Sequence, residues 1–105
     1  MYDLAVFIGR FQPFHLGHQH VVDAALDQAD KVLLLIGSSF EPRSLRNPWF
    51  YAEREAMIRS CYDADDNRRI LCKPIRDIRY NDALWISQVQ KAVYDAIPDR
   101  DARIT

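Results

Sequence analysis

Two histidines separated by two residues lie in the stretch of this sequence that is richest in chemical groups. His15 and His18 belong to the run GRFQPFHLGH, which covers residues 9–18. At this spacing, both side chains face the same way on a helix that is just beginning. Imidazoles there can donate hydrogen bonds to a polyphosphate and to charge that develops on it. A helix N-terminus adds backbone N–H groups and a positive dipole end. The run therefore predicts a phosphate-binding catalytic site.

The glycines of this run have predicted roles of their own. Gly9 lets the main chain approach a ligand, and Gly17 allows a close approach at the first helical turn. The run contains neither the G-x-x-x-x-G-K-[ST] pattern of a P-loop nor the G-x-G-x-x-G pattern of dinucleotide sites. The imidazoles would therefore act where a P-loop uses lysine.

Apolar runs of strand length must position this site. Residues 4–8 form one such run, ended by Gly9, and residues 32–36 form another, ended by Gly37. Residues 69–72 are a weaker third candidate. Because these runs are continuous rather than alternating, they predict strands that are covered on both faces, as in parallel sheets.

Helical spacing of apolar residues separates the predicted strands. One helix follows the histidines and carries Val22, Ala25, Leu26 and Ala29 on one face; others are expected over residues 51–62 and 82–97. The alternation predicts an α/β fold with a doubly wound, Rossmann-like parallel sheet. Residues 102–105 resemble the beginning of a fourth strand, so we expect a sheet that is truncated there. In such sheets ligands bind at the carboxyl ends of the strands, where residues 9–18 lie.

Composition sets the class of protein. The 105 residues predict one domain over residues 1–105, and the net charge of −1 excludes a basic arm that binds nucleic acid in bulk. No apolar run approaches the roughly 18–20 residues of a membrane span, and no signal peptide is visible. We therefore expect a cytoplasmic protein with reduced thiols at Cys61 and Cys72. The excess of arginine over lysine, eleven to three, is interpreted mainly as compositional bias.

Three motifs in order resemble one enzyme family. The run over residues 9–18 is similar to the H-x-G-H signature of nucleotidyltransferases, whose fold is of the adenine nucleotide alpha hydrolase-like type. Its full form resembles nicotinamide mononucleotide (NMN) adenylyltransferases of the archaeal type and the N-terminal domain of bifunctional NMN adenylyltransferase–Nudix hydrolases. Residues 47–54, NPWFYAER, resemble that family's N-P-F-x-x-x-E-R segment. Residues 80–85, YNDALW, resemble its N-x-x-W segment, with three residues rather than two between Asn81 and Trp85.

The resemblance implies a reaction and a set of site residues. The reaction is transfer of AMP from MgATP to NMN, which gives NAD and pyrophosphate, with His15 and His18 as catalytic residues. Trp85 would stack on the nicotinamide ring. Mg²⁺ is expected to accompany ATP, with no metal site in the protein itself. The implied ATP-binding residues are Gly9, Arg10, Phe11, His15, Gly17 and His18, and the implied NMN-binding residues are Trp85, Asp82, Asn81, Ser38 and Arg46.

The resemblance also implies a part that this chain does not supply. The family has a second phosphate motif, [ST]-x-x-[RK], after its fourth strand, so we expect the 105 residues alone to bind nucleotide weakly or not to turn over. A homo-oligomer and a C-terminal Nudix domain are left open. Two other functions are alternatives: transfer to another acceptor such as pantetheine phosphate, and a non-catalytic nucleotide-binding or regulatory module. Neither nucleic acid nor membrane is expected as a partner.

Structural roles are alternatives for several of these side chains. His15 and His18 could cap a helix, whereas a zinc site with His20 is disfavoured because no acid or cysteine is suitably spaced. Trp85 could belong to the core, and Trp49 could be a buried anchor.

Arginines and a run of acids leave further alternatives. Arg46 and Arg54 are expected either to bind phosphate or to form surface ion pairs with Glu41, Glu53 or Glu55. Ser38 lies where a strand leaves the sheet, which would also suit a floor for NMN. Residues 63–67 lack the spacing of a calcium loop and are interpreted as a solvated turn.

Overall fold

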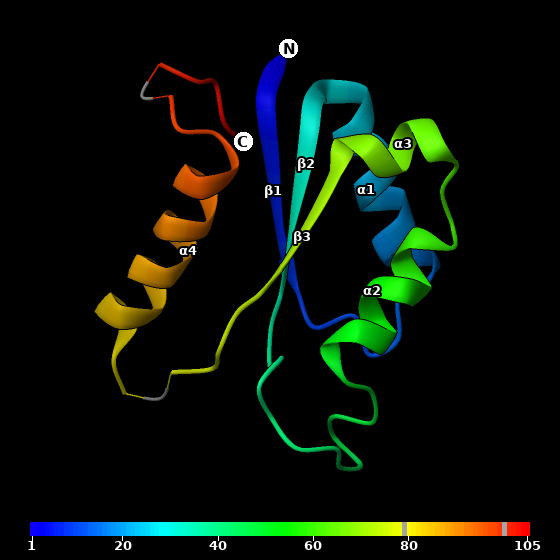
Figure 1. Cartoon of the computed structure of the whole chain (residues 1–105), viewed down its shortest axis with the longest axis vertical. Helices are drawn as coiled ribbons and strands as arrows, with labels where there is room; N and C mark the ends of the chain where they lie inside the picture. The colour runs from blue at the N-terminus through cyan, green and yellow to red at the C-terminus, as the bar shows by residue number, and fades with distance from the viewer. Residues whose placement is uncertain (79, 100) are drawn as a thin grey trace.

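Three parallel strands form the sheet of the computed structural model, which describes residues 1–78, 80–99 and 101–105. The strands are β1 (Tyr2–Gly9), β2 (Ala29–Ile36) and β3 (Ile70–Pro74), in the spatial order β1-β2-β3. Val6 of β1 pairs with Leu33 of β2, which pairs with Leu71 of β3. All three predicted strands and the parallel α/β sheet are confirmed (Figure 1).

The central strand β2 explains why its sequence is continuously apolar. Residues 32–36 have no exposed surface. Leu34 and its alternate neighbours contribute to a first cluster on one face of the sheet, and Leu33 and Leu35 contribute to a second cluster on the other face. A strand that is buried on both faces needs apolar residues at every position, because neither face meets water.

Helices cover the two faces unequally. The helices α1 (Leu16–Gln28), α2 (Tyr51–Arg59) and α3 (Ala64–Arg69) lie on one face, and α4 (Asp82–Ala96) lies alone on the other (Figure 1). The buried members of the first cluster are Ala5, Phe11, Val22, Leu26, Ala29, Val32, Leu34, Ile36, Ile58 and Ile70. The second cluster consists of Leu4, Leu33, Leu35 and Ile75, against which α4 packs.

The short helix α3 corrects the interpretation of residues 63–67 as a solvated turn. Asp63 caps this helix by accepting a hydrogen bond from the N–H of Asp66 at 2.8 Å. Two acids stand in its first turn and two arginines in its last, which favours a helix through its dipole. The element boundaries also differ from the predicted ones: Ala29 begins β2 instead of ending a helix, and α2 ends at Arg59 rather than at residue 62.

The last residues of the chain lie along the free edge of β1. Leu4 and Ile104 form a parallel bridge, and the N–H of Val6 donates to the carbonyl of Thr105 at 2.8 Å. The expected beginning of a fourth strand is present as a single bridge at Ile104 with main-chain hydrogen bonds on either side. It places β1 between β2 and residues 103–105, so that the direction of strand order reverses at β1. Such a reversal opens the crevice in which doubly wound sheets bind ligands.

An arginine binds main-chain carbonyls at the opposite end of the sheet, where β2 begins. Arg69 donates to the carbonyl oxygens of Leu26, Ala29 and Asp30 at 2.6–2.9 Å. These carbonyls lie where α1 ends and β2 begins, so one side chain satisfies three main-chain acceptors at that junction.

Within the described ranges, no helix is long and apolar enough to cross a bilayer.

Gly9 is expected to be needed for packing, and Gly37 provides the control. A Cβ atom on Gly9 would lie 2.9 Å from Cζ of the buried Phe11 ring, whereas a Cβ on Gly37 would meet nothing closer than 3.7 Å. Both changes stiffen the unfolded chain alike. We therefore expect Gly9→Ala to be about 1–3 kcal/mol less stable than Gly37→Ala in urea unfolding. Equal stabilities would contradict the packing role of Gly9.

Candidate functional site

Strained main chain concentrates at the carboxyl edge of the sheet. Phe11, Ser38 and Tyr80 have φ angles of 53°, 54° and 61°, in the left-handed region that non-glycine residues avoid. They lie in the loops that follow β1, β2 and β3 respectively. Such conformations cost of the order of 1–3 kcal/mol each and cluster at functional sites. The main chain therefore indicates the same edge as the sequence motifs.

The two histidines cap α1 together. His15 is the N-cap, and its Nδ1 accepts hydrogen bonds from the N–H groups of Gly17 at 3.1 Å and His18 at 3.4 Å. Nδ1 of His18 in turn accepts from the N–H of His15 at 3.2 Å. The capping role considered for these residues is confirmed. The expectation of free N–H groups at this helix end is wrong for Gly17 and His18, because His15 already occupies them.

The reciprocal cap fixes which ring nitrogens remain available. Each Nδ1 accepts a main-chain hydrogen bond, so the neutral imidazoles of His15 and His18 carry their protons on Nε2. The rings stack with centroids 3.7 Å apart. A Cβ on Gly17 would lie 3.0 Å from Cε1 of His15, so a glycine there lets the His15 ring approach the first turn. Each ring is thus left with one Nε2–H donor that the cap does not use.

The ring of His18 is partly enclosed by aromatic side chains. Its centroid lies 4.8 Å from that of Phe11, in an edge contact, and 5.8 Å from that of Phe14, in a stacked contact. Burial lowers the pKa of His18, and the neighbouring His15 lowers it further. His18 is therefore a neutral hydrogen-bond donor at neutral pH.

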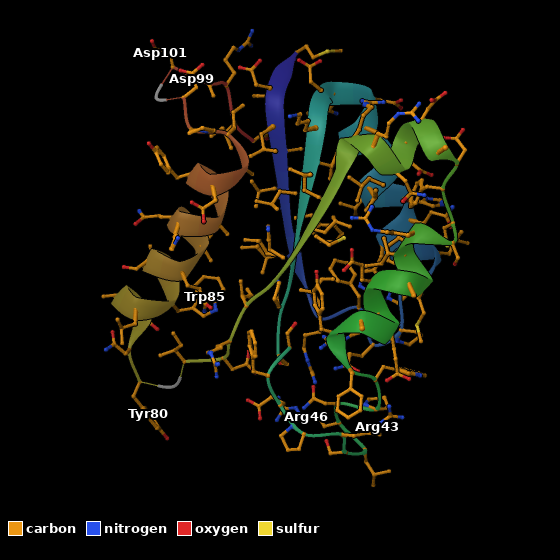
Figure 2. All side chains as sticks on the ribbon, viewed as in Figure 1. Arg43, Arg46, Tyr80, Trp85, Asp99 and Asp101 are labelled. Atoms are coloured by element: carbon orange, nitrogen blue, oxygen red, sulfur yellow. The ribbon has the colours of Figure 1, made fainter. Side chains whose placement is uncertain are left out.

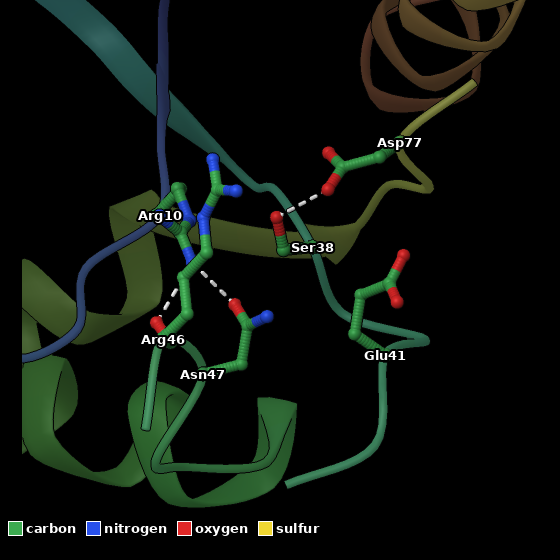
Figure 3. A pocket seen from close by; sticks show the side chains of 6 residues that line it. All are labelled: Arg10, Ser38, Glu41, Arg46, Asn47 and Asp77. Carbon is green, nitrogen blue, oxygen red and sulfur yellow. Dashed lines mark hydrogen bonds between the residues drawn. The ribbon is translucent and has the colours of Figure 1, made fainter. Parts of the chain in front are cut away.

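A cavity of about 350 Å³ opens beside the loops that follow β1 and β2 (Figure 3). Nη2 of Arg10 donates to the side chain of Asn47 and to the carbonyl of Arg46, the latter at 2.9 Å. The hydroxyl of Ser38 donates to Oδ2 of Asp77 at 2.5 Å. The cavity thus has a basic side and an acidic side. Its lining residues are Arg10, Ser38, Glu41, Arg46, Asn47 and Asp77.

Three of the six lining residues are among the expected site residues. Arg10, expected at ATP, and Ser38 and Arg46, expected at NMN, line this one cavity, and their ligand contacts stay predictions. Asp77 was missed, although it follows β3 and so stands at the edge where ligands bind. Asn47 opens a motif that we identified, and its role as a partner of Arg10 depends on a contact across 37 residues. No pattern in the sequence marks Glu41.

The structure also corrects the prediction that Arg54 binds phosphate or forms a surface ion pair. Arg54 is only 1% exposed, so it forms neither a surface ion pair nor a phosphate contact on the protein surface. Its guanidinium donates to the carbonyl oxygens of Arg10 at 2.8 Å, Gly37 at 2.7 Å and Ser38 at 3.2 Å. Two of the three acids proposed as partners pair elsewhere: Glu53 with Arg43 at 2.7 Å, and Glu55 with Arg59 at 2.8 Å.

The remaining predicted residues lie in three settings. The Phe11 ring belongs to the core, so an ATP contact by Phe11 would have to come from its main chain. Asn81 caps α4 by accepting from the N–H of Leu84 at 3.0 Å, and Asp82 is exposed in the first turn. Trp85 is half-buried and packs against the second cluster (Figure 2). This contact supports a core role for Trp85, and its nicotinamide contact stays a prediction.

Metal-binding side chains are dispersed over the part of the chain that the structure describes. No three of its His, Cys, Asp or Glu side chains group closely enough to hold an ion. His20 is exposed on α1 and does not join the stacked pair.

Comparison with known proteins gives one family match. The cytidylyltransferase-like family model matches residues 6–97. A protein of Acinetobacter baylyi named nicotinamide/nicotinic acid mononucleotide adenylyltransferase is 40% identical over 99 residues, which cover 94% of this chain and 52% of that protein. The nicotinamide-nucleotide adenylyltransferase of Archaeoglobus fulgidus is 39% identical, over 81% of this chain and 51% of that protein. The chain thus spans about half the length of these curated relatives.

A solved structure agrees over the full chain. The bifunctional NMN adenylyltransferase/ADP-ribose pyrophosphatase of Francisella tularensis, crystallised with AMP and a manganese ion, superposes with a TM-score of 0.93 at 36% identity. The match covers 100% of this chain and 31% of that one.

The lowered pKa of His18 predicts a pH dependence of stability. In the unfolded chain His18 binds a proton near pH 6.5, and in the folded protein it does so only at lower pH. The contribution of neutral His18 is therefore complete above about pH 6.5 and is lost as the pH falls through the folded pKa. We expect the Tm of His18→Gln, which retains an acceptor at this capping position, to fall less between about pH 7.5 and 5.5.

His20→Gln is the matched control, because His20 is exposed on the same helix. Its Tm is expected to follow the wild-type pH profile. Parallel profiles for His18→Gln and wild type would contradict the lowered pKa.

Proposed function

Because this chain belongs to the cytidylyltransferase-like family, we propose that it transfers AMP from MgATP to NMN, giving NAD and pyrophosphate. We further propose that residues 1–105 are the N-terminal part of this nucleotidyltransferase domain. The observation that carries the proposal is the cavity lined by Arg10 and Arg46, at the sheet edge that also presents the stacked histidines. Similarity to adenylyltransferases of this specificity, at 39–40% identity, supports the choice of substrates.

The charge distribution of the cavity suits a nucleotide with a phosphate at one end. Guanidinium groups bind phosphate through paired N–H donors, and Arg10 and Arg46 provide them on one side. On the other side, Asp77 accepts a hydrogen bond from Ser38 and retains further lone pairs for ribose hydroxyls. The volume of the cavity, about 350 Å³, is within the range of small-molecule sites.

The proposed reaction needs positioning and charge stabilisation. An oxygen of the NMN 5′-phosphate attacks the α-phosphorus of ATP, while the bond from that phosphorus to the bridging oxygen breaks. The electron pair leaves with pyrophosphate, and no side chain becomes covalently attached. Nε2–H of His15 and of His18 donates to phosphate oxygens on which charge develops. Because the reciprocal cap already orients both rings, these donors need no reorganisation.

Magnesium would arrive as part of the MgATP substrate. Mg²⁺ commonly binds substrate phosphates with one or two carboxylates rather than a complete protein cage. The carboxylates of Glu41 and Asp77 at the cavity fit that pattern. When bound, the ion neutralises charge on the pyrophosphate. The manganese ion in the Francisella structure supports a divalent metal.

Binding and turnover test the proposal directly. We expect calorimetry to detect binding of NMN and of MgATP, and a coupled assay to detect NAD and pyrophosphate in equal amounts wherever turnover occurs. His18→Ala, which removes the side-chain donor, should lower kcat by roughly 100-fold, the effect of losing one transition-state donor, with little change in the Kd of NMN. Binding of neither nucleotide, or pyrophosphate release with pantetheine phosphate but not NMN, would contradict the proposal.

Trp85 gives a separate test of acceptor binding. Stacking of the nicotinamide ring on its indole should quench tryptophan fluorescence when NMN is added. We expect Trp85→Leu, which keeps an apolar side chain against the core, to lose the quench and bind NMN about tenfold more weakly, the scale of one aromatic pair. Trp49→Phe should keep both the quench and the affinity. Unchanged NMN affinity in Trp85→Leu would leave Trp85 a core residue only.

A further inference from the structure

We propose that Arg54 is a positioning residue. From its buried position it holds the loops that follow β1 and β2 in their strained conformations, and it touches no ligand. The proposal rests on the proposed function only for the identity of the anion that the cavity takes. Arg54 would thus act on the site by holding main-chain carbonyls, whereas the sequence analysis offered a direct phosphate contact as one alternative.

The contacts of Arg54 fall on the strained peptides. The carbonyl of Arg10 belongs to the peptide that precedes Phe11, where φ is 53°. The carbonyl of Ser38, where φ is 54°, accepts from Nη2. Left-handed non-glycine residues persist only where their surroundings impose the conformation. Arg54 donates to both segments, so a single rigid group fixes their separation and their orientation.

Those same segments carry the lining of the cavity. Arg10 and Ser38 both present side chains to it, Arg10 beside Asn47 and Ser38 beside Asp77. A change in either strained peptide would turn these side chains away from their partners. The position of Arg54 therefore determines the spacing between the basic and acidic sides of the cavity.

The charge of Arg54 adds to this role. In the described ranges 1–78, 80–99 and 101–105, no carboxylate forms a salt bridge with Arg54, and three carbonyl oxygens are its partners. A buried cation without an ion-pair partner leaves positive potential around it, which a nearby phosphate would offset. The neighbouring Arg10 guanidinium contributes charge of the same sign, and the carboxylate of Asp77 offsets part of that charge.

Lysine cannot replace this arrangement. A guanidinium offers five N–H donors in a fixed plane, whereas an ammonium is a point charge on a flexible stem. Arg54→Lys therefore preserves the charge and removes the planar group that bridges Arg10 to Gly37 and Ser38.

Arg69 provides a matched control within the chain. It also donates to three carbonyl oxygens, those of Leu26, Ala29 and Asp30, at the opposite edge of the sheet. Arg69→Lys therefore loses a comparable set of main-chain hydrogen bonds without altering the cavity. If Arg54 served stability alone, neither variant would change the conformation of the loops that follow β1 and β2.

The first measurement is structural and needs no ligand. Crystal structures of Arg54→Lys and Arg69→Lys are compared with that of the unsubstituted chain. We expect φ of Phe11 or Ser38 to leave the left-handed region in Arg54→Lys and to stay there in Arg69→Lys. Retention of both angles in Arg54→Lys would overturn the proposal.

The second measurement is the affinity for inorganic pyrophosphate, by calorimetry below the Tm of both variants. We expect Arg54→Lys to bind at least about tenfold more weakly, the scale of one charge-assisted hydrogen bond that a displaced Arg10 no longer donates to the ligand, and Arg69→Lys to stay within about twofold of wild type. Equal weakening in both variants would overturn the proposal. If the unsubstituted chain binds neither NMN nor MgATP, the proposed function fails, and the crystal comparison decides the role of Arg54.

Discussion

A buried guanidinium joins the ends of the two strands on which the site is built. Where β1 and β2 leave the sheet, their carbonyl groups lose the ladder partners that a strand provides, and a buried acceptor without a partner is costly. Arg54 reaches three of these carbonyls from α2, at Arg10, Gly37 and Ser38. Helix α2 is thereby fixed to the sheet edge, and the loops after both strands acquire defined conformations.

The same use of arginine recurs elsewhere in the chain. Arg69 bridges α1 and β2 at the other end of the sheet, and Arg59 donates to the carbonyls of Asn67 and Ile70. A lysine cannot span such groups of acceptors, because its donors are not held in a plane. The excess of arginine was interpreted as compositional bias, yet part of it has this structural use.

Much of the fold follows from the sequence, because the elements are marked by local patterns. A strand that is buried on both faces must be apolar throughout, and residues 32–36 are. Apolar spacing does not predict helix α3, because this six-residue helix has no apolar face. Only an N-cap and the charges of its first and last turns mark it in the sequence. Arg54 was misassigned although Ile58, four residues later on the same helix face, is apolar and buried. The place of Asp77 in the cavity could not be predicted from local patterns. It depends on the loop after β3 meeting the loop after β2, which is a property of the tertiary structure.

The reciprocal cap of His15 and His18 has a consequence for the entropy of binding. Immobilising a side chain on association costs about 0.5–1.5 kcal/mol. Here the rotamers of both imidazoles are fixed by hydrogen bonds that form with the first turn of α1. Their loss of freedom is therefore part of folding, and a phosphate ligand that bound these rings would not have to overcome this cost. The affinity and the rate of association of a phosphate ligand would both reflect a surface whose donors are already oriented.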